Sequence, residues 1–238
     1  AISQADPRPM THPQRDRLCE HLQRVPYFAG LDAGELCQLA GLATWHEYAP
    51  GAIVFLEGDV NTGLYAVDVG WVKVVKFSLD GREQVLRYFG PGEIFSEIGI
   101  FLARPNPATA IALEHAALWR LHRSTLQPLF SAQPALLLHV MANMADRIAH
   151  LAELVADLSL HTVEVRLARL LLEAAADGTL ERQAWLTQAE LAARLGTVPD
   201  VLSRALRTLA DAGLIRFDRR QITILDRPGL LQRAQLVP

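Results

Sequence analysis

The chain has 238 residues, of which 50% are hydrophobic and 21% are charged. This length favours two domains over one, and the composition excludes a disordered or collagen-like chain. The formal net charge of −3, taken whole, argues against a nucleic-acid-binding protein. Residues 1–160, however, carry 12 basic and 17 acidic side chains, a net of −5, whereas residues 161–238 carry 11 and 9, a net of +2. We therefore expect two units with different partners.

The cysteine content excludes several kinds of site. Cys19 and Cys37 are the only cysteines, too few for a disulfide framework, a four-cysteine zinc site or a four-thiolate iron–sulfur cluster. We interpret them as two ordinary thiols in a reducing compartment. The sequence contains no run of about 18 apolar residues and no secretory signal pattern. These features predict a cytoplasmic protein without a membrane partner.

The N-terminal half changes its pattern twice. Residues 1–14 contain three prolines and no hydrophobic periodicity, which predicts a disordered leader. Short helical stretches follow and are interrupted at Pro26 and Gly30. From Thr44 onward, short β-type runs alternate with turn signals such as Asp80-Gly81, at spacings of about 8–12 residues. Such spacing is typical of a β sandwich or a barrel-like unit.

A long helix is predicted after Pro134. Its apolar residues alternate spacings of four and three, a heptad pattern sustained over about three repeats. The pattern favours a coiled-coil dimer over a helix packed only on its own β unit, although Leu136, Val140 or Leu154 would let it do both. The predicted dimer interface consists of Leu137, Met141, Met144, Ile148, Leu151, Val155 and Leu158.

The C-terminal part carries a helix–turn–helix pattern. Thr187 and Glu190 have the spacing of a capping box that opens a first helix. Gly196 marks a tight turn, and Pro199 suits the first turn of a second helix. Two short β runs around residues 218–220 complete the pattern of a winged helix-turn-helix.

Outward side chains of this second helix are suited to reading DNA. Arginine donates two hydrogen bonds to guanine, a carboxylate accepts from cytosine, and a serine hydroxyl serves either role. The alternative is a set of solvated polar positions on a small helical domain, but the capped helix, glycine turn and basic wing together favour DNA. The predicted DNA-binding residues are Thr187, Gln188, Val198, Asp200, Ser203, Arg204, Arg207, Arg219 and Arg220.

Three segments precede the long helix and the C-terminal domain: PGAIVFLEGD at 50–59, LYAVDVGWVKV at 64–74 and FGPGEIFSEIGIF at 89–101. In this order they resemble the Crp–Fnr family of bacterial transcription regulators. The resemblance implies an α+β fold with three parts: an N-terminal β-roll effector-sensing domain of the cyclic-nucleotide-binding type over residues 15–130, a dimerisation helix and hinge over 131–160, and a winged helix-turn-helix over 161–238. It also implies a homodimer that binds an inverted repeat in double-stranded DNA, with RNA polymerase as a partner of an activator.

The family's E-x-x-S-R motif, which reads bases from the recognition helix, is only partly matched. Ser203 and Arg204 agree with it, whereas Asp200 is one methylene shorter than the usual glutamate. Pro199 replaces an arginine that many relatives carry. The Ser-Arg pair resembles the Fnr-type reader, which implies half-sites related to TTGA.

The resemblance implies an effector pocket between the β-roll and the long helix. Pro107 and Ala108 stand where cyclic-nucleotide members hold the phosphate with an arginine–serine pair, which argues against cyclic AMP. Two cysteines exclude the Fnr-type iron–sulfur cluster, and Ile98 replaces the haem-binding histidine of the carbon-monoxide branch. The predicted pocket residues are Glu97, Ile98, Ala108, Thr109, Met144, Ile148 and Leu151.

Two further forms of control remain open. One is a haem-dependent nitric-oxide or redox-responsive regulator, since residues 104–110, 158–160 and 222–227 resemble the nitric-oxide branch. The other is a constitutive regulator without a ligand. No metal site is predicted. An enzyme is not expected either, because the sequence has no G-x-S-x-G, P-loop or G-x-G-x-x-G motif.

Overall fold

The protein is described here by a computed structural model, which covers residues 11–28, 30–60, 63–102, 104–175 and 177–235. The chain divides into two compact units. The first unit comprises residues up to Lys76 together with Leu86–His150, and the second comprises Phe77–Val85 and the chain from Leu151 onward. No helix among the described residues is long and apolar enough to cross a membrane.

Capping groups set the ends of the N-terminal helices. The elements are α1 (His12–Arg24), the 3-10 turn η1 (Pro26–Phe28) and α2 (Ala33–Gly41). The Gln14 side chain accepts a hydrogen bond from the Thr11 N–H at 2.8 Å, and the Asp32 carboxylate accepts one from the Glu35 N–H at 2.8 Å. The expected leader of residues 1–14 is therefore wrong at its end, because this cap starts a helix at His12. Residues 1–10 of that prediction lie outside the described residues.

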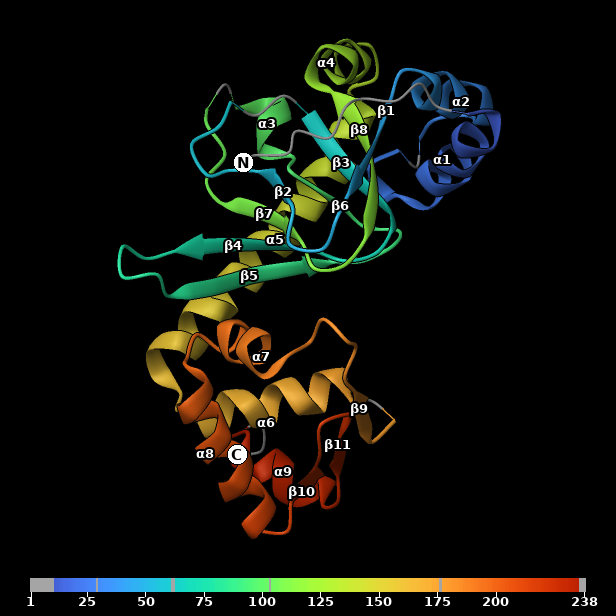
Figure 1. Ribbon diagram of the computed structural model, residues 1–238. Helices are drawn as coiled ribbons and strands as arrows, with labels where there is room; N and C mark the ends of the chain where they lie inside the picture. The colour runs from blue at the N-terminus through green and yellow to red at the C-terminus, as the bar shows by residue number, and fades with distance from the viewer. Residues whose placement is uncertain (1–10, 29, 61–62, 103, 176, 236–238) are drawn as a thin grey trace. The chain divides into compact units, whose positions relative to one another are not determined.

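Two four-stranded sheets form the β-roll (Figure 1), with strand orders β1-β8-β3-β6 and β2-β7-β4-β5. The strands are β1 (Thr44–Tyr48), β2 (Ile53–Phe55), β3 (Gly63–Val69), β4 (Val72–Phe77), β5 (Glu83–Phe89), β6 (Ile94–Phe95), β7 (Thr109–Ala112) and β8 (Ala116–His122). Seven of these strands confirm the predicted β runs. The sequence did not indicate β6 or the short helix α3 (Ile98–Phe101), since two- and four-residue elements carry no usable periodicity.

Two hydrophobic clusters stabilise the first unit. One packs Leu18 and Leu22 of α1, together with Phe28, against Trp119 of β8 and Leu136 of the long helix, all of them buried. The other fills the inside of the roll with side chains from both sheets, including Tyr48, Tyr65, Val67, Phe89 and Phe95. The first sheet therefore contributes side chains to both clusters, one shared with the helices and one inside the roll.

Helix α4 (Arg123–Ala132) leads into the predicted long helix, α5 (Ala135–Leu160). Leu136 and Val140 are buried in the first unit, which confirms the expected second face of this helix. Met141, Ile148 and Val155 remain exposed at 64%, 67% and 62%. One helix thus has an apolar face that is used within the chain and an apolar stripe that is not.

The second unit has the predicted winged helix-turn-helix order. Its elements are α6 (Val163–Ala174), β9 (Thr179–Glu181), α7 (Gln188–Arg194), α8 (Pro199–Asp211), β10 (Ile215–Phe217), β11 (Gln221–Ile224) and α9 (Arg227–Arg233). The sheet has the order β10-β11-β9. Leu167, Leu191, Leu202 and Leu209 meet in its core. Strand β9 and helix α9 were not indicated by the sequence.

The close packing around Gly70, in the turn between β3 and β4, can be tested by substitution. Its φ is +79°, and a Cβ there would clash with the backbone carbonyl oxygen of His115. Gly51 has a similar φ of +78° but open space around its Cβ position. We expect Gly51→Ala to lower the free energy of unfolding by about 1–2 kcal/mol through backbone strain, and Gly70→Ala to lower it by more. Urea unfolding of both variants measures the difference, and equal losses would contradict the close approach of His115.

Candidate functional site

Helix α8 presents one apolar and one polar face. Leu202, Ala205, Leu206 and Leu209 are buried against the rest of the second unit. Among the predicted DNA-binding residues, those exposed on or before α8 are Val198, Asp200, Arg204 and Arg207, while Ser203 is half-buried. The amphipathic pattern therefore places Asp200, Arg204 and Arg207 on the exposed face of α8, and a recognition helix turns such a face toward base edges.

Ser203 and Gln188 are brought together by the turn between α7 and α8. The Gln188 amide donates to the Ser203 hydroxyl oxygen at 2.6 Å, and that hydroxyl donates to the Pro199 carbonyl at 2.8 Å. Thr187 caps α7, with its side-chain oxygen accepting from the Glu190 N–H at 3.2 Å. The hydroxyl proton of Ser203 is already used, so its remaining lone pair is available as an acceptor.

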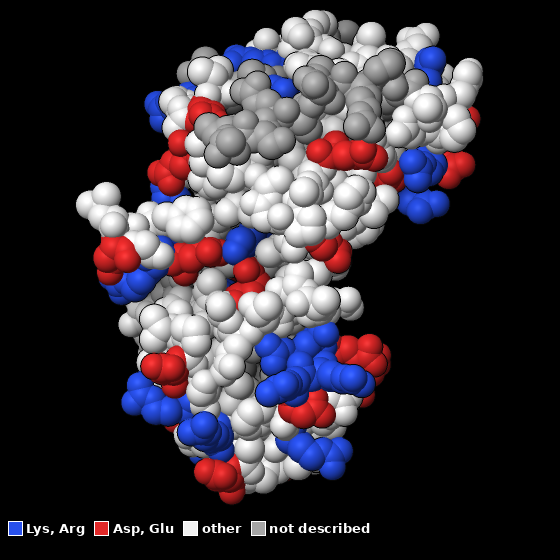
Figure 2. Space-filling model, viewed as in Figure 1, with Lys and Arg blue, Asp and Glu red and all other residues white. Residues whose placement is uncertain are grey.

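The wing is held by a carboxylate at its tip. The Asp218 side chain accepts hydrogen bonds from the backbone N–H groups of Arg220 at 2.6 Å and Gln221 at 2.9 Å. These donors lower the pKa of Asp218 below its ordinary value, so the carboxylate remains charged and the turn stays closed. Arg219 and Arg220 are both exposed at this turn. Figure 2 shows basic side chains gathered over α8 and over the region of β9 and β11.

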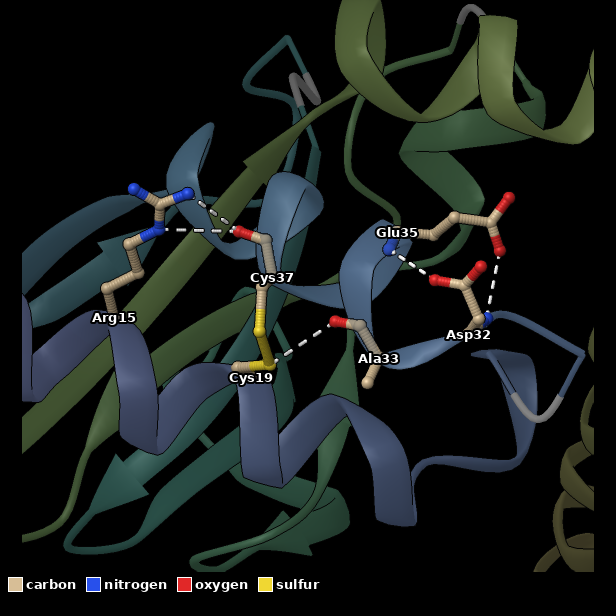
Figure 3. Close-up of a disulfide and its surroundings, with 6 residues drawn as sticks. All are labelled: Arg15, Cys19, Asp32, Ala33, Glu35 and Cys37. Carbon is tan, nitrogen blue, oxygen red and sulfur yellow. Dashed lines mark hydrogen bonds between the residues drawn. A yellow bond between two sulfur atoms is a disulfide. The ribbon is translucent and has the colours of Figure 1, made fainter.

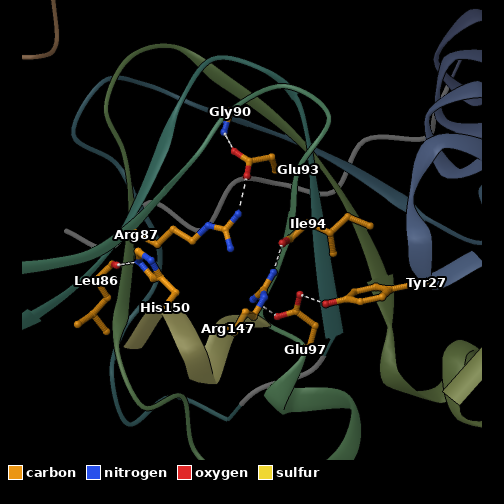
Figure 4. Close-up of polar contacts among 9 residues, drawn as sticks. All are labelled: Tyr27, Leu86, Arg87, Gly90, Glu93, Ile94, Glu97, Arg147 and His150. Atoms are coloured by element: carbon orange, nitrogen blue, oxygen red, sulfur yellow. Dashed lines mark hydrogen bonds and ion pairs between the residues drawn. The ribbon is translucent and has the colours of Figure 1, made fainter. Parts of the chain in front are cut away.

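In the first unit, Glu97 is buried and has two partners (Figure 4). The Tyr27 hydroxyl donates to its Oε1 atom at 2.7 Å, and the Arg147 guanidinium of α5 forms an ion pair with Oε2. Arg147 also donates to the Ile94 carbonyl at 2.6 Å. Burial raises the pKa of Glu97, while Arg147 and the Tyr27 hydrogen bond act in the opposite direction. Burial also raises the pKa of Tyr27, and the Glu97 charge adds to this effect, so Tyr27 keeps the proton that it donates.

Aromatic rings surround this ion pair. The guanidinium carbons of Arg147 and Arg87 lie 5.5 Å and 5.1 Å from the Phe89 ring centroid. Phe89 in turn packs on Phe95, with the ring centroids 5.1 Å apart. Arg87 is paired with Glu93 at 2.9 Å. The two arginines are therefore held by both carboxylates and aromatic faces.

The predicted pocket residues lie in different environments. Ala108 and Thr109 are buried, and the Thr109 hydroxyl accepts from the Glu57 N–H at 3.0 Å. Ile98 is half-buried, and Met144 packs against the core of the first unit. Ile148 and Leu151, by contrast, are exposed at 67% and 44%.

The sequence analysis missed Arg147 and Tyr27. Glu97 was predicted as a pocket residue without a partner being named, and Arg147 of α5 pairs with it. One signal was present, because Arg147 is the only lysine or arginine between residues 135 and 160. Tyr27 gave no comparable signal, since 70 residues separate it from Glu97.

The two cysteines are a correction to the sequence analysis. Cys19 of α1 and Cys37 of α2 form a disulfide, with their Cα atoms 5.0 Å apart (Figure 3). Helices α1 and α2 pack side by side, which brings together residues that are 18 positions apart. The expectation of two separate thiols rested on spacing motifs, which do not register a pair formed by helix packing.

No metal site was predicted for this unit, and haem was left as an alternative. Within the residues that the structure describes, no three His, Cys, Asp or Glu side chains are grouped to hold a metal ion. Haem requires only an axial ligand, so the haem alternative stays a prediction. His139 and His150 are exposed on α5, and Nε2 of His150 lies 3.4 Å from the Leu86 carbonyl oxygen.

Two known families match the two units. The family described as "Cyclic nucleotide-binding domain" matches residues 45–133, and the family described as "Crp-like helix-turn-helix domain" matches residues 165–233. An effector-binding type of domain followed by this DNA-binding domain defines a class of transcription regulators.

Similar proteins extend this assignment over the chain. The "Cyclic AMP receptor protein" of Thermus thermophilus is 32% identical over 192 residues, covering 80% of this chain and 88% of that protein. The "CRP-like cAMP-activated global transcriptional regulator" of Mycobacterium tuberculosis is 29% identical over 222 residues, covering 91% of this chain and 99% of that protein. FixK2 from Bradyrhizobium japonicum has the same fold, with a TM-score of 0.70 and 24% identity over 80% of this chain and 96% of that chain. The chain belongs to the Crp–Fnr family of transcription regulators.

The contacts around Glu97 bear on the expectation that cyclic AMP is not bound. A buried phosphate needs arginine or N–H donors, and the family resemblance assigns Pro107 and Ala108 to the phosphate-binding positions. The Pro107 carbonyl accepts from the Lys76 ammonium at 2.9 Å, and this lysine is also paired with Glu57. Glu97 itself is held by Arg147 and Tyr27. The charges of this site are thus balanced within the chain.

Substitution of Arg147 tests how much its ion pair with Glu97 contributes to stability. We expect Arg147→Met to lower the free energy of unfolding at pH 7 by about 3–5 kcal/mol, because it leaves a buried carboxylate without its cation. The pKa of Glu97 is raised in the folded state, so the folded variant binds more protons than the unfolded chain. Stability therefore falls as the pH rises through the interval between the ordinary pKa and the raised value.

The matched control is the double variant Glu97→Gln/Arg147→Met, which has no buried charge. It should recover most of the lost stability and lose the pH dependence. Urea unfolding at several pH values between about 5 and 8, the usual range of greatest stability, measures both effects. Wild-type stability of Arg147→Met at pH 7 would contradict the role of the ion pair.

Proposed function

We propose that this Crp–Fnr regulator acts as a homodimer that binds an inverted repeat in double-stranded DNA. The observation that carries the proposal is the polar face of α8, on which Asp200, Ser203 and Arg204 lie together in the first two turns. Arginine and carboxylate side chains at these positions match the donors and acceptors of base edges in the major groove. Arg219 and Arg220 at the wing suit the phosphate backbone.

The exposed stripe of α5 supports the dimer. Met141, Ile148 and Val155 recur every seven residues and are all more than 60% exposed. The alternating positions Leu137, Met144 and Leu158 are half-buried, and Leu151 is 44% exposed. A heptad stripe of this kind is buried when it packs on the same stripe of a second copy. A two-fold dimer then requires half-sites about 34 Å apart along the DNA.

Several finer features belong to the same proposal. Ser203 and Arg204 support half-sites related to TTGA, with changes where Asp200 and Pro199 depart from the family's reader. An activator of this type would contact RNA polymerase. A DNA-binding regulator acts where the DNA is, so we propose a cytoplasmic location. The relatives named above are regulators and not enzymes, and we propose no catalytic activity for this chain.

Control by cyclic AMP is not part of the proposal, although the names of both relatives mention cyclic AMP. Pro107, Ala108 and the internally paired Glu97 argue against a nucleotide phosphate. The sequence leaves two alternatives open. One is a haem-dependent nitric-oxide or redox response, and the other is constitutive binding to DNA.

Selection of binding sites from random DNA tests the function. We expect an inverted repeat, with specific binding that survives excess random competitor. Arg204→Ala should weaken binding by about 1–3 kcal/mol and relax the preference at one base pair. Arg219→Ala is the matched control, because loss of a phosphate contact weakens all sequences alike. Recovery of no common site, or a single isolated half-site, would contradict the proposed dimeric reader.

The dimer has its own test on α5. Ile148→Asp places a charge in the apolar stripe, where it would be buried without a partner, so the dimer should dissociate. Ala149→Asp adds the same charge to an exposed position beside the stripe and should leave the dimer intact. Equilibrium sedimentation measures the mass of each variant. A dimer mass for Ile148→Asp would show that this stripe is not the interface.

A further inference from the structure

We propose that Cys19 and Cys37 form a reversible thiol–disulfide switch that sets the DNA affinity of the regulator. The proposal rests on the DNA-binding function proposed above and adds the form of its control. Disulfides in a compartment that keeps thiols reduced are usually transient and redox-sensing. A protein that works on DNA in such a compartment and still pairs its only two cysteines fits that use.

The two cysteines differ in exposure. Cys19 is 6% exposed and belongs to the core cluster, whereas Cys37 is half-buried. We therefore expect an external thiol to attack Cys37. The Arg15 guanidinium donates two hydrogen bonds to the Cys37 carbonyl, at 3.3 Å and 3.1 Å (Figure 3). A positive charge near a cysteine favours the thiolate that takes part in exchange.

The reduced state is also accommodated by the surrounding groups. The Sγ atom of Cys19 lies 3.9 Å from the Ala33 carbonyl oxygen, which would accept the thiol proton after reduction. Helix α2 keeps its own cap through Asp32 and Glu35, independently of the cysteines. Reduction would thus leave α2 capped and Sγ of Cys19 beside an acceptor, which suits a reversible switch.

The disulfide closes the segment that carries Tyr27. Residues 19 and 37 flank η1, and Tyr27 of η1 is only 3% exposed. Its hydroxyl supplies one of the hydrogen bonds to Glu97, whose other partner is Arg147 of α5. The covalent bond therefore restrains a donor that belongs to the ion pair on the long helix.

A second contact links α2 to the same helix. The Glu35 carboxylate, two residues before Cys37, accepts a hydrogen bond from the Gln133 amide at 2.6 Å. Gln133 lies two residues before the start of α5. The helix that holds the more accessible cysteine is thus tied to the beginning of α5, while Tyr27 is tied to its middle.

The chemistry is a two-step exchange with a low-molecular-weight thiol. A thiolate attacks Sγ of Cys37, the bond between the two Sγ atoms breaks, and Cys19 leaves as a thiolate that takes up a proton. A second thiol attacks the mixed disulfide and releases Cys37 as a thiol together with the small-molecule disulfide. The protein gains two electrons and two protons, and two small thiols are oxidised. Reoxidation follows the same steps in reverse.

The oxidised form is expected to be the form that binds DNA tightly. The disulfide restricts the separation of α1 and α2, so it favours the arrangement in which Tyr27 and Glu35 hold α5. After reduction, arrangements of α1 and α2 that do not hold α5 also become populated. The fraction of protein that is able to bind DNA therefore falls. We expect the affinity for DNA to drop by about tenfold, a usual size for coupling between two sites.

The experiment uses the full chain and the duplex selected from random DNA by the oxidised protein. Gel-shift titrations are carried out in buffers of graded reduced and oxidised glutathione, and thiol alkylation with mass spectrometry gives the fraction of disulfide. The affinity for the duplex should rise and fall with the fraction of protein that carries the disulfide. Equal affinity in both states, tighter binding by the reduced form, or failure of the disulfide to form would overturn the switch.

Two variants separate a switch from a purely structural disulfide. Cys19→Ser/Cys37→Ser should bind like the reduced protein and no longer respond to the buffer. Tyr27→Phe keeps the ring and the disulfide but removes the hydroxyl, so it should form the bond normally and lose most of the dependence of affinity on redox state. Circular dichroism confirms that each variant is folded. Full redox dependence in Tyr27→Phe would overturn the route through Glu97.

The two proposals fail in different ways. Absence of sequence-specific binding by both the oxidised and the reduced protein would contradict the DNA-binding function. Specific binding that ignores the redox state would contradict only the switch.

Discussion

The buried carboxylate of Glu97 is the constraint on which the sensor unit depends. A carboxylate at this depth is tolerated only with a cation and hydrogen bonds, and its partners come from two distant parts of the chain, Tyr27 of η1 and Arg147 of α5. Satisfying one charge thus joins the N-terminal helices, the turn after β6 and the long helix. Ser96, next to this carboxylate, has a φ of +75°, a strained conformation for a residue other than glycine.

The second unit differs from the first in its electrostatics. Residues 161–238, which contain its helix-turn-helix, have a net charge of only +2, so attraction to phosphates alone gives little affinity, and binding must rely on the geometry of a few side chains. The hydrogen bonds of Ser203 to Gln188 and Pro199, and those of Asp218 at the wing, hold this geometry before DNA is present. Preorganised groups lose less entropy on binding. In the proposed dimer, pairing two copies would double the number of contacts, which would link DNA binding to the exposed stripe of α5.

Local patterns predicted most of the fold, because caps, turns and periodicity act over a few residues. They predicted seven strands, the long helix and the helix–turn–helix, and therefore the exposed face of α8. They could not predict contacts between Arg147 and Glu97 or between Tyr27 and Glu97, which are 50 and 70 residues apart. The disulfide of Cys19 and Cys37 was missed for the same reason, since only the packing of α1 on α2 reveals it. The candidate DNA-binding face could be outlined from the sequence because it lies on one helix, whereas the contacts around Glu97 are assembled from distant parts of the unit.

This difference bears on how the regulator can be controlled. A ligand shifts an equilibrium only by its difference in affinity for two states, and a site whose charges are already paired leaves a charged ligand little to gain. A covalent bond needs no such pocket. The Cys19–Cys37 bond limits how far α1 and α2 can separate, whether or not a ligand is present. In the proposed switch, this restraint would reach α5 through the contacts of Tyr27, Glu97 and Arg147, which the chain itself provides.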